Sequence, residues 1–351
     1  MELLYSDVLP VRYKGHQNFK QAFEKCLVPA TDLRIVTGYV SEESLMELKA
    51  MLAYYKDKNK TKSCELVIGM HGLEGFTKTQ YQAACNLGQF LSDEHLGGVR
   101  VCTAFKFHGK IYSFLKNGEP KASILGSSNL SGLLGKGLQW EADLLFTEAE
   151  KIKKLLILHK DIVTKATKSI FDHEPRIISA ASGMLEGVAG VDRPSRDEFE
   201  AVKARATELS FEIPLKAEAK SNLNVYFGKG RETKATGAIR PRPWYEAEVI
   251  VPNSITMQRG YPDDHKPFTV YTNDGWKFRC KVSGQNKKNL RSEDDLQTLG
   301  RWIKGHLEAA GVLRVGELIT PYMLQDYGAS QMTLTATDDP DIWLLDFSPK
   351  K

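Results

Sequence analysis

Short apolar runs and longer amphipathic segments alternate along the first half of the chain. The runs at Leu33–Val40 and Glu65–Met70 have the length and β-branched content of buried strands. Each precedes a segment with helical spacing. The first of these, at 42–58, follows the capping residue Ser41, and the second covers 78–91. Strand–helix alternation of this kind predicts an α/β domain.

Further strand signals then follow one another without an intervening helix. They occur in "VRVCTAF", in the stretch Phe107–Phe114, in "KASILGSSN" and in "LQWEADLLF", and a long helix is predicted from about Glu148 to Thr167. Strands that follow one another through turns pair in antiparallel fashion. We therefore expect part of the sheet of this α/β domain to be antiparallel.

The pattern changes in the middle of the chain, where small residues, glycine, proline and charges mix. We interpret residues 179–208 as a linker of intermediate order, with a short helix near 198–206. Beyond it, short strands are interrupted by one strong helix that ends at Gly311 and by a second helix in "TPYMLQDYG". The predicted domains are residues 1–178 and 209–351, and the second is expected to be a mostly β, open barrel.

Composition favours a soluble globular protein, with 42% hydrophobic and 26% charged residues. No apolar run approaches the roughly 18 residues of a membrane span, and the first residues lack the order of a secretory signal. The cytoplasm is therefore the expected compartment. The cysteines are dispersed without a CxxC pair, which favours buried free thiols; they are Cys26, Cys64, Cys85, Cys102 and Cys280.

The formal net charge of +4 hides an uneven distribution. Two segments, Lys220–Pro243 and Lys277–Arg291, carry balances of +5 and +6, so the remaining residues sum to −7. Positive charge confined to two segments in the last third predicts a surface that binds a polyanion. The alternative is two solvated loops that happen to be basic.

Candidate chemistry centres on the predicted strand "FHGKIYSF". The dipeptide "NG" at 117–118 is the strongest hairpin signal in the chain. A two-residue hairpin without a bulge pairs Ser127 with His108, and it brings Lys110 and Asn129 to the same face. An isolated histidine in a strand is most often structural, but four polar groups on one face favour a reaction centre.

These residue types suit attack on a phosphodiester. His108 can act as a nucleophile or as a general acid and base, while Lys110, Ser127 and Asn129 can stabilise charge on phosphoryl oxygens. Glu141 lies among apolar residues, where a carboxylate needs a partner; that partner is either the far nitrogen of the imidazole or an ordinary salt bridge. The sequence holds no metal-ligand cluster beside these residues, so we expect metal-independent chemistry without a cofactor.

At this point the residues resemble a known family. "HGK", followed by "GSSNL" and "WEADLLF", is similar to the HxK–GSxN–E signature of the phospholipase D superfamily. Leu115 stands where many members carry an aspartate, a departure that is typical of a subgroup of nucleases and not of lipid enzymes. The superfamily uses two HxK motifs at one active site, whereas this chain has one, because His71 lacks the lysine. The resemblance therefore implies a homodimer formed through the N-terminal domain.

The basic, mostly β second part extends the resemblance to restriction endonucleases of the BfiI type, in particular the NgoFVII/NgoAVII group. It implies a phospholipase D-like mixed-sheet sandwich followed by a B3-like DNA-binding pseudobarrel. It also implies that His108 attacks phosphorus to form a phosphohistidine, while the other chain's copy of this residue protonates the leaving oxygen and then activates water. Lys110, Asn129 and Ser127 are implied to hold the phosphate, and Glu141 to orient the imidazole.

In B3-like modules two arms embrace the major groove of DNA, and the two basic segments lie where the arms are expected. Arginine reads guanine, glutamine and asparagine read adenine edges, and lysine holds phosphate. For any one residue, plain phosphate contact or solvation is the alternative. The residues predicted to bind DNA are Lys229, Arg231, Lys234, Arg240, Arg242, Lys277, Arg279, Lys281, Gln285, Asn286, Lys287, Lys288 and Arg291.

The combined expectation is a site-specific, metal-independent type II restriction endonuclease that acts on double-stranded DNA and has no membrane partner. A flexible linker between the domains would permit cleavage outside the recognition sequence. Two alternatives stay open: a phospholipid-processing transphosphatidylase, and a DNA-binding protein whose first domain is only a dimerisation scaffold. The sequence leaves the recognition site, the cleavage positions and the need for an accessory ATPase or helicase open.

Overall fold

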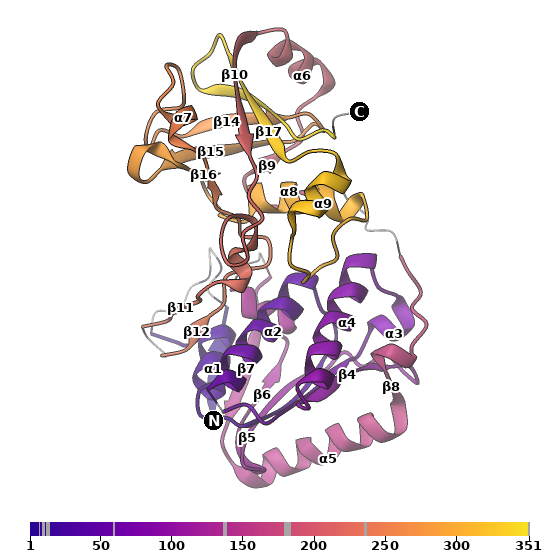
Figure 1. Ribbon diagram of the computed structural model, residues 1–351. Helices are drawn as coiled ribbons and strands as arrows, with labels where there is room; N and C mark the ends of the chain where they lie inside the picture. Colours follow the sequence, from indigo (N-terminus) through magenta and orange to yellow (C-terminus); the bar gives the residue numbers. More distant parts are fainter. Residues whose placement is uncertain are drawn as a thin grey trace. The chain divides into compact units, whose positions relative to one another are not determined.

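The computed structural model describes residues 1–6, 8, 11, 15–58, 60–135, 139–178, 184–234 and 237–349. By contacts the chain divides into two compact units (Figure 1). The N-terminal unit comprises residues 1–180 together with 230–241, and the C-terminal unit comprises residues 181–229 together with 242–351. No helix of the described residues is both long and apolar enough to cross a membrane.

The N-terminal unit is built on an eight-stranded sheet in the order β1-β7-β6-β5-β2-β3-β4-β8. Its strands are β1 (Glu2–Tyr5), β2 (Asp32–Thr37), β3 (Ser63–Ile68), β4 (Gly97–Cys102), β5 (Lys110–Lys116), β6 (Glu119–Gly126), β7 (Ala142–Phe146) and β8 (Thr167–Ser169). Strands β2, β3 and β4 pair in parallel, and the other neighbours pair antiparallel. The predicted mixed sheet is confirmed.

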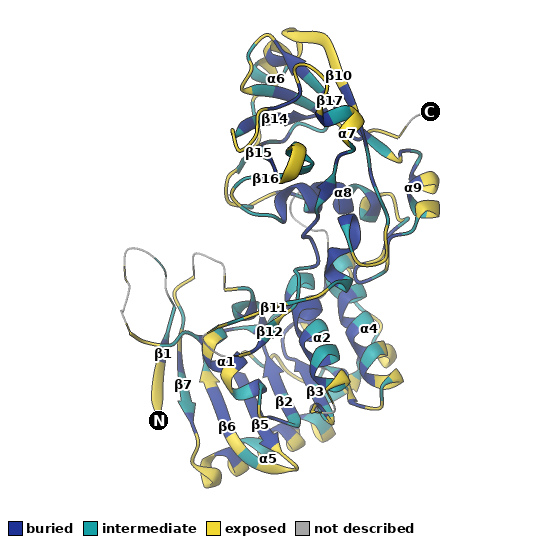
Figure 2. Cartoon of the chain, turned by 60° about the vertical axis from the view of Figure 1, so that its left-hand side comes forward, coloured by how far each residue is buried: buried dark blue, intermediate teal, exposed yellow. Residues whose placement is uncertain are grey.

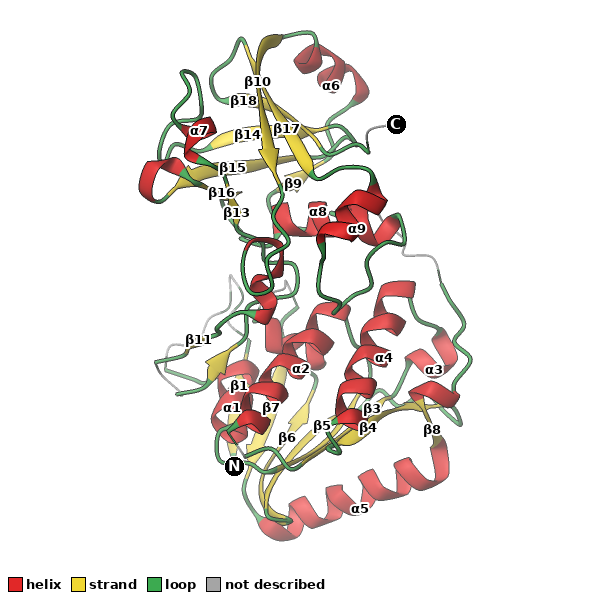
Figure 3. Cartoon of the chain, viewed as in Figure 1, coloured by secondary structure: helices red, strands yellow, loops and turns green. Residues whose placement is uncertain are grey.

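Helices cover both faces of this sheet, as Figures 1 and 3 show. The long helix α5 (Ala149–Ala166) lies on one face, and α2 (Glu42–Asp57) and α4 (Lys78–Asp93) lie on the other. The shorter helices are α1 (Phe19–Leu27), α3 (His71–Glu74), η1 (Leu130–Leu134) and η2 (Ile170–Asp172). Ser41 caps α2 as predicted, since its side chain accepts a hydrogen bond from Ser44 N. The unit is therefore a three-layer sandwich in which the central strands β2, β3 and β5 are largely buried (Figure 2).

A short hairpin from the middle of the chain joins the N-terminal unit. Its strands are β11 (Arg231–Glu232) and β12 (Ile239–Arg240), and β12 contacts α2. This hairpin belongs to the first basic segment, which the sequence assigns to the DNA-binding domain. The structure thus divides that segment between the two units.

The C-terminal unit contains a second sheet, in the order β10-β17-β18-β14-β15-β16-β13, with β9 paired to β15. Only β14 and β18 pair in parallel among its described strands, and the sheet does not close into a barrel. Its strands are β9 (Val191–Asp192), β10 (Ala206–Pro214), β13 (Val249–Ile250), β14 (Phe268–Thr272), β15 (Lys277–Ser283), β16 (Asn289–Ser292), β17 (Gln331–Thr337) and β18 (Ile342–Asp346). Its helices are α6 (Arg196–Lys203), α7 (Asn253–Thr256), α8 (Thr298–Ala309), α9 (Pro321–Tyr327), η3 (Asn222–Phe227) and η4 (Gln285–Lys287). The predicted open, mostly β domain is confirmed.

The expected linker differs from what the structure shows between 184 and 208. Strand β9 pairs with β15, and Glu198 of α6 accepts hydrogen bonds from Tyr271 and Lys277 at 2.7 and 3.0 Å. These residues are therefore part of the C-terminal unit. Pairing with distant strands gives order to a segment whose composition resembles that of a flexible connection.

Candidate active site

The register between β5 and β6 differs from the predicted one by one residue. Lys116 pairs with Glu119 as expected, but a bulge at Lys121 shifts every later pair. Pro120 precedes the bulge, and proline interrupts a strand ladder because it has no N–H to donate. Lys110 consequently pairs with Gly126 and not with Leu125.

His108 lies just before β5 and is exposed, whereas Lys110, the first residue of β5, is only 3% exposed. Lys110 Nζ lies 3.0 Å from His108 Nδ1 and 3.2 Å from Nε2, and it donates to His108 O at 2.5 Å. Burial lowers the pKa of Lys110, and the carboxylates of Glu141 and Asp143 act in the opposite direction. The buried ammonium thus lies directly beneath an accessible imidazole.

Two glycines at the carboxyl ends of parallel strands allow the chain around His108 to approach closely. A β-carbon added at Gly69 would lie 2.1 Å from Phe107 O, and Phe107 N donates to Gly69 O at 3.0 Å. A β-carbon at Gly38 would lie 3.5 Å from His108 Cα and 3.4 Å from Asn129 Oδ1. The backbone of Gly38 therefore lies close to both His108 and Asn129, and the missing side chain lets the two segments approach.

Asn129 is held by the segment that follows β2. Its Oδ1 accepts hydrogen bonds from Tyr39 N at 3.0 Å and from Thr37 Oγ1 at 3.5 Å. Within the described part of the chain, the hydrogen bonds of this side chain all go to the oxygen. The amide NH2 group is therefore left to donate to a substrate oxygen.

The two serines of "GSSN" have different surroundings. Ser127 is exposed, and its hydroxyl exchanges hydrogen bonds with the backbone of Ala142, so the predicted pairing of Ser127 with His108 is wrong. Ser128 is buried instead, and both its N–H and its hydroxyl donate to Asp143, at 3.0 and 2.6 Å. Neither serine contacts His108 through a hydrogen bond among the described residues.

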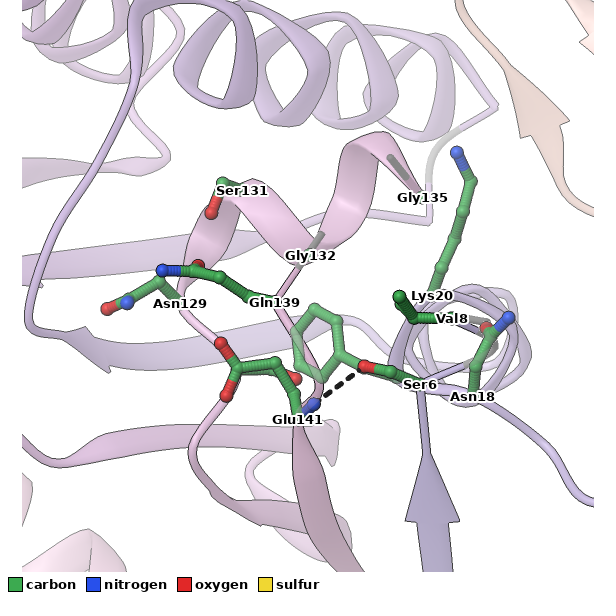
Figure 4. Close-up of a pocket in the computed structure, with 12 residues that line it drawn as sticks. Ser6, Val8, Asn18, Lys20, Asn129, Ser131, Gly132, Gly135, Gln139 and Glu141 are labelled. Carbon is green, nitrogen blue, oxygen red and sulfur yellow. Dashed lines mark hydrogen bonds between the residues drawn. The ribbon is translucent and has the colours of Figure 1, made fainter. Parts of the chain in front are cut away.

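Glu141 lies immediately before β7, beside a pocket of about 130 Å³. Figure 4 shows its carboxylate on the same side of this pocket as Asn129, and the dashed line marks the bond from Glu141 N to Ser6 Oγ, 2.9 Å long. No hydrogen bond joins Glu141 to His108 in the described residues. The negative charge of Glu141 raises the pKa of Lys110. Its predicted role as the partner of the imidazole stays a prediction.

Two further residues, one beside His108 and one acting on Lys110, escaped the sequence analysis. The ring of Tyr39 meets the His108 ring edge-on, with centroids 5.8 Å apart, and its hydroxyl donates to Glu74 at 2.7 Å. Tyr39 follows β2, and polar residues at the carboxyl ends of strands are the signal that points to it. Asp143 is, like Glu141, a carboxylate in an otherwise apolar strand, and it lies two residues further along the chain. That setting could have pointed to it.

His71 belongs to the structure of the site and not to its chemistry. Its Nδ1 donates to Gly75 O at 2.8 Å, and its Nε2 accepts from Val40 N at 3.2 Å. The ring is 5% exposed, and burial lowers its pKa. His71 is therefore buried at the start of α3, shortly after β3.

The second basic segment forms a pair of neighbouring strands in the C-terminal unit. Lys281 of β15 pairs directly with Arg291 of β16, so two positive charges share one face. Gln285 and Asn286 are exposed where the two strands connect. Other members are already paired: Lys277 with Glu198, Arg279 with Glu293 and Lys287 with Asp263, at 3.0, 2.9 and 3.8 Å.

The first basic segment is less uniform. Lys229, Arg231, Lys234 and Arg240 are exposed, and Arg231 pairs with Arg240 across the β11–β12 hairpin. Arg242 is half-buried and forms ion pairs with Glu246 and Glu248, at 2.7 and 2.5 Å. Carboxylates of the same unit therefore already compensate the charge of Arg242.

In the described ranges, no three or more His, Cys, Asp and Glu side chains lie together as a metal site requires. The cysteines are free thiols, and Cys64, Cys102 and Cys280 are buried, as the sequence predicts.

The polar cluster at this end of the sheet consists of His108, Lys110, Asn129, Glu141 and Asp143.

Comparison with known proteins matches both parts of the chain. Residues 17–171 match the NgoFVII restriction endonuclease N-terminal PLD domain, and residues 201–338 match the NgoFVII C-terminal B3-like DNA-binding domain. Among curated proteins there is no significant match.

Several solved structures are similar to about half of the chain. Nuc of Salmonella typhimurium, a phospholipase D family member, has 12% identity and a TM-score of 0.30, covering 50% of this chain and 97% of that chain. NucT from Helicobacter pylori has 13% identity and a TM-score of 0.31, covering 47% and 98%. The phosphatidylserine synthase of Haemophilus influenzae Rd KW20 has 15% identity and a TM-score of 0.35, covering 49% and 41%.

The two matched domains come from one enzyme and occur in the same order here. With the sandwich fold and the His-Lys-Asn cluster, they define an endonuclease of the phospholipase D type joined to a B3-like DNA-binding domain. The chain belongs to the NgoFVII restriction endonuclease family.

Proposed function

We propose that the protein is a site-specific, metal-independent type II restriction endonuclease that acts as a homodimer on double-stranded DNA. The observation that carries this proposal is the convergence of His108, Lys110 and Asn129 at one end of the N-terminal sheet. The B3-like domain selects a short sequence, and the nuclease domain cleaves the phosphodiester.

The proposed first step is attack by His108 on phosphorus. A lone pair of the exposed imidazole forms an N–P bond, the bond to the leaving oxygen breaks, and a phosphohistidine results. Negative charge develops on the non-bridging oxygens during this step. The Lys110 ammonium and the Asn129 amide donate hydrogen bonds to them, whereas the Ser127 hydroxyl would have to leave Ala142 O before it could donate to the phosphate.

One such set lacks a proton donor for the leaving oxygen. In the proposed homodimer, His108 of the partner subunit supplies that proton and then takes a proton from water. The resulting hydroxide attacks phosphorus, the N–P bond breaks, and the first imidazole is released. Glu141 and Asp143 favour the protonated form of Lys110 throughout, because both carboxylates lie close to it.

Cleavage in the presence of a chelator tests this mechanism. We expect purified protein to cut large natural DNA into discrete fragments in excess EDTA, because an imidazole nucleophile and a lysine ammonium supply the charge stabilisation. The measurement is gel electrophoresis of the digest followed by sequencing of the fragment ends. A strict requirement for added magnesium would refute the metal-independent mechanism, and random ends would refute site specificity.

A further inference from the structure

Asp143 lies outside the proposed catalytic set and bonds the turn that leads from Ser127 to Asn129. It lies in β7 and is 3% exposed. A carboxylate buried to this degree is unfavourable unless hydrogen bonds and a positive charge compensate it. Both are present: Ser128 supplies the hydrogen bonds, and Lys110 of β5 supplies the positive charge.

The sheet register brings Asp143 toward Lys110. Asp143 of β7 pairs with Gly126 of β6, and Gly126 pairs in turn with Lys110 of β5. Directly paired residues share a face, so Lys110 and Asp143 point the same way with a glycine between them. A β-carbon at Gly126 would lie 2.2 Å from Asp143 Oδ1, which means that the carboxylate occupies the space above this glycine.

The same carboxylate holds the turn that leads to Asn129. Asp143 Oδ1 accepts from Ser128 N at 3.0 Å, and Oδ2 accepts from Ser128 Oγ at 2.6 Å. Ser128 O in turn accepts from the Tyr112 hydroxyl at 2.8 Å. Because Ser128 directly precedes Asn129, these three bonds fix the direction in which the Asn129 side chain leaves the sheet.

We propose that Asp143 is a positioning residue of this active site, which anchors the Ser128–Asn129 turn and keeps the buried Lys110 positively charged. The titratable groups around Lys110 are His108 on its own segment, Glu141 and Asp143 on the β7 segment, and Tyr39 beside the imidazole. Burial favours the neutral amine of Lys110, and the negative charge of Asp143 opposes this effect. The kinetic consequences rest on the proposed nuclease function, whereas the titration of Lys110 does not.

The variant Asp143→Asn tests the charge of the side chain while keeping its size and shape. Asparagine keeps an oxygen for Ser128 N but removes the negative charge, so the titration midpoint of Lys110 is expected to fall by about one pH unit. Carbon-13 NMR of labelled lysine measures this midpoint, with Lys110→Arg identifying the signal. The alkaline limb of the single-turnover cleavage rate is expected to move by the same amount, while DNA affinity stays unchanged.

Ser128→Ala tests the anchoring alone, because it removes one bond to Asp143 and leaves the charge in place. The cleavage rate is expected to fall roughly tenfold through misplacement of Asn129, with the Lys110 midpoint unchanged. Ser113→Ala is the matched control: its hydroxyl bonds Ser123 Oγ at 2.8 Å between β5 and β6, on the face of the sheet opposite Lys110. It is expected to lower thermal stability without altering the rate at a permissive temperature.

The outcomes are distinguishable. An unchanged Lys110 midpoint in Asp143→Asn would overturn the charge role, and a wild-type rate in Ser128→Ala would overturn the anchoring role. If Asp143→Asn does not fold, Ser128→Ala still decides the anchoring. If the wild-type protein does not cut DNA at all, the proposed function fails, while the NMR titration still decides whether Asp143 supports the charge of Lys110.

Discussion

The two units handle functional charge in opposite ways. In the N-terminal unit the ammonium of Lys110 is buried, and it is surrounded by His108, Glu141 and Asp143. In the C-terminal unit the basic side chains line two strands near solvent, and Lys281 lies directly opposite Arg291. A buried charge in a low-dielectric site acts strongly on a reacting group, whereas exposed charges act additively on a polyanion.

Substitutions are therefore expected to act differently in the two units. Groups in the buried cluster depend on one another, so the loss of one removes the function of all. The exposed basic residues each contribute one contact, and those already paired with carboxylates contribute less. One substitution in the buried cluster should therefore abolish most of the cleavage rate, whereas each substitution of an exposed basic residue should lower DNA affinity by a small amount.

The largest expected effect comes from His108→Ala. Removal of the proposed nucleophile is expected to lower the cleavage rate at least roughly 10³-fold while leaving DNA affinity unchanged, because His108 lies in the other unit from the basic strands β15 and β16. Single-turnover cleavage and a gel-shift titration on the same DNA measure the two quantities. Retained cleavage would remove His108 from the mechanism.

A mixing experiment extends this test to the dimer. If both copies of His108 serve one active site, an equal mixture of wild-type and His108→Ala chains forms about one quarter of fully active dimers after subunit exchange. Activity proportional to the wild-type fraction would instead indicate that each chain acts alone. Lys165→Ala, a substitution on the exposed end of α5, serves as the unperturbed partner in a control mixture.

The next effect concerns the stability of the N-terminal unit in acid. Burial lowers the pKa of His159 on α5 to about 4, whereas an unfolded histidine titrates near 6.5. Between these values only the unfolded state binds the proton. Stability present above pH 6.5 is therefore lost as the pH falls toward 4, by roughly 2–3 kcal/mol.

Urea unfolding at pH 7 and pH 5 measures this loss, and His159→Gln is expected to reduce the difference between the two conditions. An equally steep pH dependence in the variant would assign the loss to other groups. DNA binding by the C-terminal unit should be less sensitive over the same interval, because His159 lies outside that unit.

The smallest effect compares two basic residues of the C-terminal unit. Lys281 has no ion-pair partner among the described residues, so Lys281→Ala is expected to weaken DNA binding severalfold and to reduce the slope of log affinity against log salt by about one. Arg242→Met is expected to leave this slope unchanged, since Arg242 already pairs with Glu246 and Glu248.

Arg242→Met is instead expected to destabilise the unit, because it removes a partner of the buried Glu246. Salt-dependent binding titrations and thermal unfolding distinguish the two variants. Equal loss of salt dependence in both would contradict the view that internal ion pairs remove a residue from the DNA-binding face.

Local sequence determined much of this protein. Alternating strand and helix signals, the Ser41 cap, the turn at 117–118 and the "HGK" and "GSSN" motifs all depend on neighbours in the chain. Short-range patterns therefore sufficed to predict an α/β domain with a partly antiparallel sheet and an open β domain, and they pointed to His108, Lys110 and Asn129 as candidate site residues.

Which of these residues contact one another depends on the tertiary structure. The bulge at Lys121 moved Ser127 away from His108 and placed Gly126 beside Lys110, a result that depends on pairing between strands. Asp143 gained its importance only through that pairing, and the basic hairpin 230–241 joined the N-terminal unit through contacts with α2. Register and long-range contacts arise from residues far apart in sequence, so no local pattern specifies them.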